Sequence, residues 1–153
     1  MLWGFLFYNI VMKCVSANQE DIIILYDFNK KLINEYEDLT KIDYDCVLKW
    51  IYHKIEKHID EYYKVYLDDI CVAYYRFIAV DGKMELDDLY VLEAYRNQGI
   101  GTKIVQKCIN STDLPVYLYV FRKNYRAVKL YERLGFKIVD EIKDSRYIME
   151  YQR

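Results

Sequence analysis

Two glycines separated by a single residue stand just before a predicted helix, in the stretch YRNQGIGTKIV from Tyr95 to Val105. A glycine at a helix start costs conformational order unless the backbone must pass close to another group, and the chain has only five glycines. Backbone N–H groups at a helix start are unpaired, carry the positive end of the helix dipole and therefore form an anion site. Arg96 to Gly101 is a candidate pyrophosphate cradle, although the pattern alone fits an ordinary tight turn equally well.

Carboxylates are concentrated in KMELDDLYVL, the predicted strand that precedes the glycines. A carboxylate on a strand face is able to accept a proton from a substrate, to hold a cation, or simply to face solvent. The strand period of two predicts one face with Glu85, Asp87, Leu89 and Val91 and the opposite face with Asp88 and Tyr90.

A third group lies in NYRAVKLYERLGF, which predicts a short amphipathic helix ended by Gly135. Asn124, Ala127 and Tyr131 fall at i, i+3 and i+7, so they share one helix face. Asn124 is suited to capping the helix, to bonding a ligand, or to both. Tyr131 also fits a core position, because the chain has 18 tyrosines.

The elements that position these residues follow from hydrophobic periodicity and turn signals. A strand near 10–16 precedes two helices with apolar residues at helical spacing, the first with Asp21 as a possible cap. β-Branched and aromatic runs follow, with hairpin turns at Asp68-Asp69 and Asp81-Gly82. The whole order is β-α-α-β-β-β-α-β-α-β-β, which predicts an α+β domain with helices on a mixed, mostly antiparallel sheet.

Composition narrows the class of protein. The chain has 153 residues, 54% of them hydrophobic and 30% charged, which indicates one globular domain. A net charge of −2 argues against nucleic-acid binding. Four cysteines without a CxxC spacing indicate reduced thiols in a cytoplasmic protein, and His53 and His58 stand five apart, which does not suit a metal site. The apolar stretch MLWGFLFYNIV is too short to span a bilayer; it is either an extension before a start at Met12, or an extra strand or dimer contact.

The element order, the stretch LYVLEAYRNQGIG and the stretch NYRAVKLYERLGF, which begins 23 residues after Gly101, together resemble the GNAT superfamily of acyl-CoA N-acyltransferases (Gcn5-related N-acetyltransferases). The resemblance covers 12–153 in element order, and its specific motifs lie in 84–136. The chain departs from the family where Glu93-Ala94 replaces a frequent Pro-Glu and Asn97-Gln98 replaces Gly-Lys. The missing lysine leaves more of the phosphate contact to backbone donors.

The resemblance implies a single GNAT acetyltransferase domain over 12–153, after an apolar extension over 1–11, with acetyl-CoA as acyl donor and no metal. Pantetheine would lie between the YVLE and VYLYV strands and pair with strand backbone. A backbone N–H at Val91 would face the thioester oxygen and stabilise the oxyanion. The cofactor-binding positions implied are Leu89, Tyr90, Val91, Arg96, Asn97, Gln98, Gly99, Ile100, Gly101, Thr102, Asn124 and Ala127.

The same resemblance implies two catalytic residues. Tyr131 occupies the general-acid position, and a phenol of pKa about 10 is able to protonate the departing thiolate. Glu85 lies where several family members carry a catalytic glutamate, so it is the candidate base that deprotonates the substrate ammonium, directly or through water. The alternatives are a core tyrosine and a glutamate that faces solvent or only holds a cation.

The acceptor is predicted from charge. In this family it enters beside the first two helices and the central strands, opposite the CoA entrance. Carboxylates at that rim would favour a small cationic amine (polyamine-like, aminoglycoside-like or lysine-like) or a basic peptide; the candidates are Asp43, Asp45, Asp68, Asp69, Glu85, Asp87 and Asp88. A non-catalytic acyl-CoA-binding module and a tyrosine-rich interaction protein are the competing functions. A homodimer is expected by family analogy alone.

Overall fold

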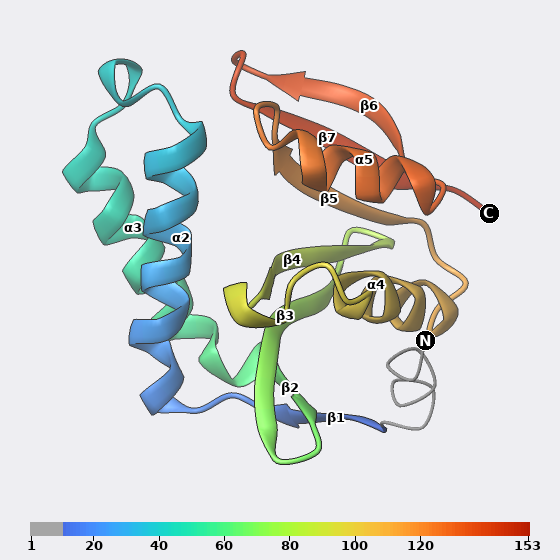
Figure 1. The fold of residues 1–153 in the computed structure, drawn as a ribbon. Helices are drawn as coiled ribbons and strands as arrows, with labels where there is room; N and C mark the ends of the chain where they lie inside the picture. The colour runs from blue at the N-terminus through green and yellow to red at the C-terminus, as the bar shows by residue number, and fades with distance from the viewer. Residues whose placement is uncertain (1–10) are drawn as a thin grey trace.

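A computed structural model describes residues 11–153, and its element order confirms the order predicted from the sequence (Figure 1). Within residues 11–153, seven strands form one sheet in the order β1-β2-β3-β4-β5-β7-β6, in which only the β4–β5 pair is parallel. The mostly antiparallel α+β fold is therefore confirmed. The strands are β1 (Met12–Ser16), β2 (Tyr62–Leu67), β3 (Ile70–Val80), β4 (Lys83–Val91), β5 (Val116–Phe121), β6 (Lys137–Ile142) and β7 (Arg146–Tyr151).

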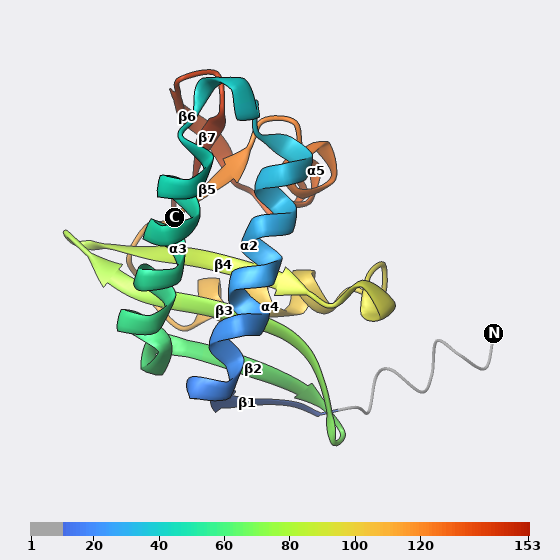
Figure 2. The same ribbon diagram turned by 90° about the vertical axis from the view of Figure 1, so that its left-hand side faces the viewer.

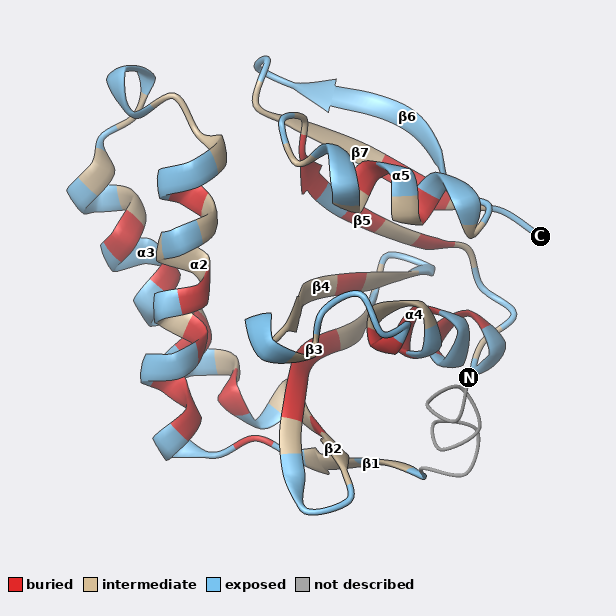
Figure 3. Cartoon of the chain, in the orientation of Figure 1, coloured by how far each residue is buried: buried red, intermediate tan, exposed pale blue. Residues whose placement is uncertain are grey.

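The helices cover both faces of the sheet. α2 (Ile22–Tyr36) and α3 (Tyr44–His58) lie side by side across one face (Figure 2), where they share an apolar core with Tyr62, Tyr74 and Phe121. α4 (Ile100–Asn110) and α5 (Tyr125–Arg133) pack in the second core, on the other face, through a buried stripe on each helix (Figure 3). The predicted extension over 1–11 lies outside the described residues except for Val11.

The start of α2 differs in detail from the prediction. Asp21 stands at the first position, but its carboxylate forms no cap of α2. It accepts hydrogen bonds from the backbone N–H of Asn18 at 2.9 Å and from the hydroxyl of Tyr74 at 2.7 Å, and it pairs with Lys64 at 3.1 Å. Burial alone would raise the pKa of Asp21, but these hydrogen bonds and Lys64 lower it overall. The residue joins the first helix to the sheet.

A β-bulge in β4 overturns the predicted alternation of its side chains. The register between β3 and β4 shifts between Tyr74 and Arg76, and Asp88 adopts a left-handed φ of 48°. One extra residue on β4 reverses the faces of all residues after it. Leu89 and Val91 therefore pack with the α4–α5 core, on the face opposite to the one expected. Tyr90, which was predicted on the face opposite Glu85 and Asp87, instead lies with them on the α2–α3 side.

β4 and β5 separate soon after they meet. Their pairing is confined to Met84 with Val116 and Glu85 with Tyr117, after which the two strands diverge (Figure 1). β5 continues in register with β7 over its whole length. The sheet is thus split at its centre, as the resemblance implied, and the backbone edge of β4 beyond Glu85 faces the gap.

Candidate active site

One large cleft of about 2010 Å³ lies at the split and extends between α2–α3 and α5. It brings together 13 of the 14 site residues predicted from the sequence; only Gln98, which is exposed, does not line it. The lining members are Glu85, Leu89, Tyr90, Val91, Arg96, Asn97, Gly99, Ile100, Gly101, Thr102, Asn124, Ala127 and Tyr131.

The glycine stretch forms the start of α4. Gly99 is the residue before the helix and has a left-handed φ of 77°, which a side chain would strain, and a Cβ there would meet nothing within 4 Å. A Cβ on Gly101 would lie 3.6 Å from Leu130 Cδ2 and 3.8 Å from Val91 Cγ2, which is ordinary contact. The space beside Gly99 is therefore open, and the surroundings of Gly101 would accommodate an alanine side chain. A helix start with space beside it suits an anionic group.

The β4 edge at the gap is the second part of the site. Leu92 N–H donates to Val72 O of β3 at 2.9 Å. Because N–H groups alternate between the two edges of a strand, the N–H of Val91 points to the opposite edge, toward the gap. Val91 O accepts a hydrogen bond from Arg96 Nε at 2.9 Å, so the guanidinium joins this edge to the glycine stretch.

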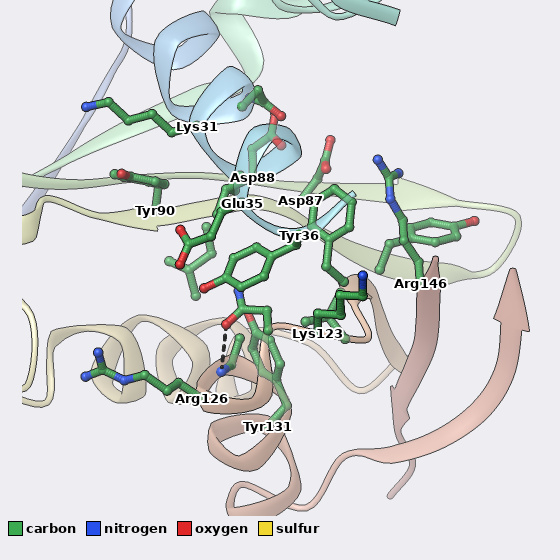
Figure 4. Close-up of a pocket in the computed structure, with 18 of the residues that line it drawn as sticks. Lys31, Glu35, Tyr36, Asp87, Asp88, Tyr90, Lys123, Arg126, Tyr131 and Arg146 are labelled. Carbon is green, nitrogen blue, oxygen red and sulfur yellow. Dashed lines mark hydrogen bonds between the residues drawn. The ribbon is translucent and has the colours of Figure 1, made fainter. Parts of the chain in front are cut away.

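Tyr131 extends from α5 into the cleft (Figure 4). It is 8% exposed, and its ring packs edge-on against Phe136 with centroids 5.6 Å apart. Its hydroxyl forms no hydrogen bond with the described residues. Burial, with a smaller contribution from Cys108, raises the pKa of Tyr131 above its usual value, so the phenol stays protonated. Asn124 caps the same helix, since its Oδ1 accepts from Ala127 N–H at 3.3 Å.

Glu85 differs from its acidic neighbours because no cation pairs with it among residues 11–153. Burial, followed by the charge of Asp87, raises the pKa of Glu85. Lys54 Nζ lies 2.6 Å from Asp87 and 3.6 Å from Asp88, and Arg76 lies 3.1 Å from Asp87. The environment of Glu85 therefore favours a carboxyl that exchanges a proton, whereas the two aspartates are held in ion pairs.

Three of the seven candidate rim carboxylates, Glu85, Asp87 and Asp88, line the cleft, and the other four do not. Asp43 instead caps α3 by accepting from Cys46 N–H at 3.2 Å, and Asp68 forms the exposed β2–β3 turn. Basic side chains that the sequence did not single out also line the cleft, among them Lys31, Lys54, Arg76, Lys123, Arg126 and Arg146. Charge pattern along the sequence could not reveal them, because they come from separate elements.

Within the part of the chain that the structure describes, no group of three or more His, Cys, Asp or Glu residues is arranged to hold a metal ion. Over the same residues, no helix combines the length and apolar character needed to cross a bilayer.

The sequence profile of the acetyltransferase (GNAT) family matches residues 24–136. The acetyltransferase PseH of Campylobacter jejuni is 25% identical over 140 residues, 87% of each chain. The thialysine N-ε-acetyltransferase of Mus musculus is 42% identical over 60 residues, 37% of this chain and 35% of that protein. The structure of the PaiA N-acetyltransferase from Thermoplasma acidophilum in complex with coenzyme A aligns over 94% of this chain and 100% of that chain, with a TM-score of 0.72 and 18% identity.

Several curated relatives are matched over less than half of their own length. The family profile nevertheless covers most of this chain, including both motifs of the cleft. The chain therefore belongs to the acetyltransferase (GNAT) family. The family and the acyltransferase class predicted from the sequence are confirmed.

Proposed function

We propose that the chain transfers an acetyl group from acetyl-CoA to a primary amine of a small cationic molecule or peptide. One observation carries the proposal: the start of α4, the free edge of β4 and the buried Tyr131 all line one cleft at the split in the sheet. The first suits a pyrophosphate, the second an extended pantetheine arm and the third a departing thiolate. PaiA, whose fold this chain shares, binds coenzyme A.

The residues present fit acetyl-CoA, because open space lies beside Gly99 at the start of α4, where unpaired backbone N–H groups suit an anion. When bound, acetyl-CoA supplies an acyl group activated as a thioester. Val91 N–H would donate to the thioester oxygen and stabilise the charge that develops there. Glu85 would accept a proton from the substrate ammonium, and the Tyr131 hydroxyl would donate a proton to the thiolate that leaves.

An amine acceptor must lose a proton and the departing thiolate must gain one. The cleft carries a candidate for each transfer, Glu85 on β4 and Tyr131 on α5. The mouse relative acts, by its name, on the ε-amine of thialysine. That supports a primary amine on a flexible chain as the first class to test.

Release of free CoA from acetyl-CoA with a panel of primary amines tests the proposal directly. The expected result is amine-dependent CoA release together with an acetylated product whose mass is increased by one acetyl group. Stabilisation by acetyl-CoA without turnover of any amine would favour the non-catalytic acyl-CoA-binding module. Failure to bind acetyl-CoA at all would contradict both.

A further inference from the structure

Arg146 differs from the other arginines that are at least partly buried. Arg76 pairs with Glu61 and Asp87, and Arg122 pairs with Glu141 at 2.5 Å. Arg146, at the start of β7, is half-buried and forms no ion pair among residues 11–153. Removing a guanidinium from water without a carboxylate is unfavourable, so an unpaired arginine in a cleft suggests a ligand that supplies the missing anion.

The guanidinium of Arg146 is held in a defined orientation. It lies over the ring of Phe121, 4.7 Å from the centroid, and Phe121 itself stacks against Tyr36 of α2 with centroids 6.1 Å apart. Stacking occupies the face of the guanidinium and leaves the N–H donors on its edge for a ligand. Such an edge matches the two oxygens of a carboxylate or phosphate.

Arg146 stands apart from the glycine stretch. Figure 4 shows Arg126 and Arg146 on opposite sides of Tyr131, and Arg126 is hydrogen-bonded to Asn97 of the glycine stretch. Asp87 and Glu85 of β4 line the same cleft as Arg146. The cleft therefore has a candidate anion site at α4 and, across Tyr131 from Arg126, a second cationic group in the same cleft as the acidic residues of β4.

We propose that Arg146 binds an oxyanion, carboxylate or phosphate, carried by the amine acceptor, so that the preferred acceptor is zwitterionic. This inference rests on acetyl transfer to a primary amine, as proposed above, and changes the preferred acceptor from a purely cationic amine to a zwitterionic one. The amine end would lie toward Glu85 and the oxyanion end at the edge of Arg146. A polyamine would instead bring a second cation toward the guanidinium, which is repulsive. The geometry thus favours an amino acid-like acceptor over a polyamine-like one.

Matched amines test the inference. Alkylamines of increasing length are compared with the ω-amino acids and aminoalkylphosphonates of the same chain length, from β-alanine to ε-aminohexanoate, in the CoA-release assay. We expect one oxyanion series to exceed its alkylamine partners in kcat/KM by about 10- to 100-fold, the range of a charge-assisted hydrogen bond. The chain length with the highest kcat/KM measures the distance between the groups that bind the amine and the oxyanion. The series with the higher kcat/KM shows whether the oxyanion is a carboxylate or a phosphate.

Arg146→Met should reduce the kcat/KM ratio of oxyanion to alkylamine about 10-fold or more. Arg122→Met is the matched control: that arginine also lies over an aromatic ring, Tyr147, but does not line the cleft, and the ratio should stay at the parent value. KM for acetyl-CoA in Arg146→Met should stay near that of the parent; a large rise would assign Arg146 to CoA and overturn the inference.

A parent enzyme that prefers alkylamines, or a ratio that Arg146→Met leaves unchanged, overturns the inference while acetyl transfer stands. Absence of turnover with every amine contradicts the proposed function instead. In that case calorimetry of the same ω-amino acids and phosphonates, with CoA present, decides the inference separately. Binding to the parent and loss of binding in Arg146→Met support it, and no binding to the parent overturns it.

Discussion

Tyr131→Phe removes one oxygen from the wall of the cleft and leaves the ring in place. The ring keeps its edge contact with Phe136, and the hydroxyl has no hydrogen-bond partner among the described residues that would be left unsatisfied. No buried side-chain nitrogen or oxygen atom among the described residues lacks a hydrogen-bond partner, which leaves the Tyr131 hydroxyl open to the cleft. We therefore expect the free energy of unfolding of Tyr131→Phe to stay within about 0.5 kcal/mol of that of the parent.

The expected loss is in turnover. If the phenol protonates the departing thiolate, its removal should slow the chemical step about 100-fold, which corresponds to roughly 2.7 kcal/mol of activation free energy. Because burial raises the pKa of Tyr131, the acid stays protonated at neutral and mildly alkaline pH. Turnover of the parent should therefore show no alkaline loss from this group below a pH of about 10.

The assay is CoA release under single-turnover conditions, where chemistry limits the rate, together with melting curves with and without acetyl-CoA. Tyr151→Phe is the matched control, because Tyr151 contacts the same Phe136 with centroids 5.7 Å apart but does not line the cleft. Its rate should equal that of the parent. A parent-like single-turnover rate for Tyr131→Phe would refute the general-acid role and make Tyr131 a packing residue.

Three further perturbations test the other parts of the cleft. Gly101→Ala should stay folded with up to about 1 kcal/mol more stability, whereas Gly101→Glu should lose the rise in Tm that acetyl-CoA causes; an equal rise would place the phosphates elsewhere. Burial raises the pKa of Glu85, so kcat/KM of the parent should rise as the pH passes through that raised pKa. The rate of Glu85→Gln relative to the parent should be lowest at low pH, and identical pH–rate profiles of the two proteins would exclude Glu85 as the base. Lys54→Met removes the cation from half-buried Asp87 and Asp88 and should cost about 1–3 kcal/mol in urea unfolding, while exposed Lys41→Met should cost less than about 1 kcal/mol; equal costs would show that the Lys54 pairs contribute no more than an exposed pair.

Local signals predicted the element order and both motifs. Helical periodicity, the Asp81-Gly82 turn and the glycine stretch are each encoded within a few residues, and the structure places all three as expected. The sequence could not show which candidate rim carboxylates are already paired, because their partners come from other elements: Lys54 of α3 pairs with Asp87 of β4. Arg146 could not be predicted from the sequence for a related reason: only the fold shows that no carboxylate among residues 11–153 pairs with it.

The β-bulge at Asp88 could not be predicted from the sequence either, and it decides which side chains of β4 face each side of the sheet. A regular strand would have put Glu85 and Val91 on one face. The extra residue instead sends Val91 to the α4 side, where its Cγ2 lies 3.8 Å from the Cβ position of Gly101, while Glu85 stays on the acceptor side. β4 thus supports the glycine stretch with one face and presents a carboxylate with the other. The left-handed φ of Asp88 costs backbone energy, and its pairing with Lys54 and a 2.6 Å hydrogen bond from Tyr62 hold it there. The ion pairs near the acceptor are therefore better understood as supports of the bulge than as a device that attracts cations.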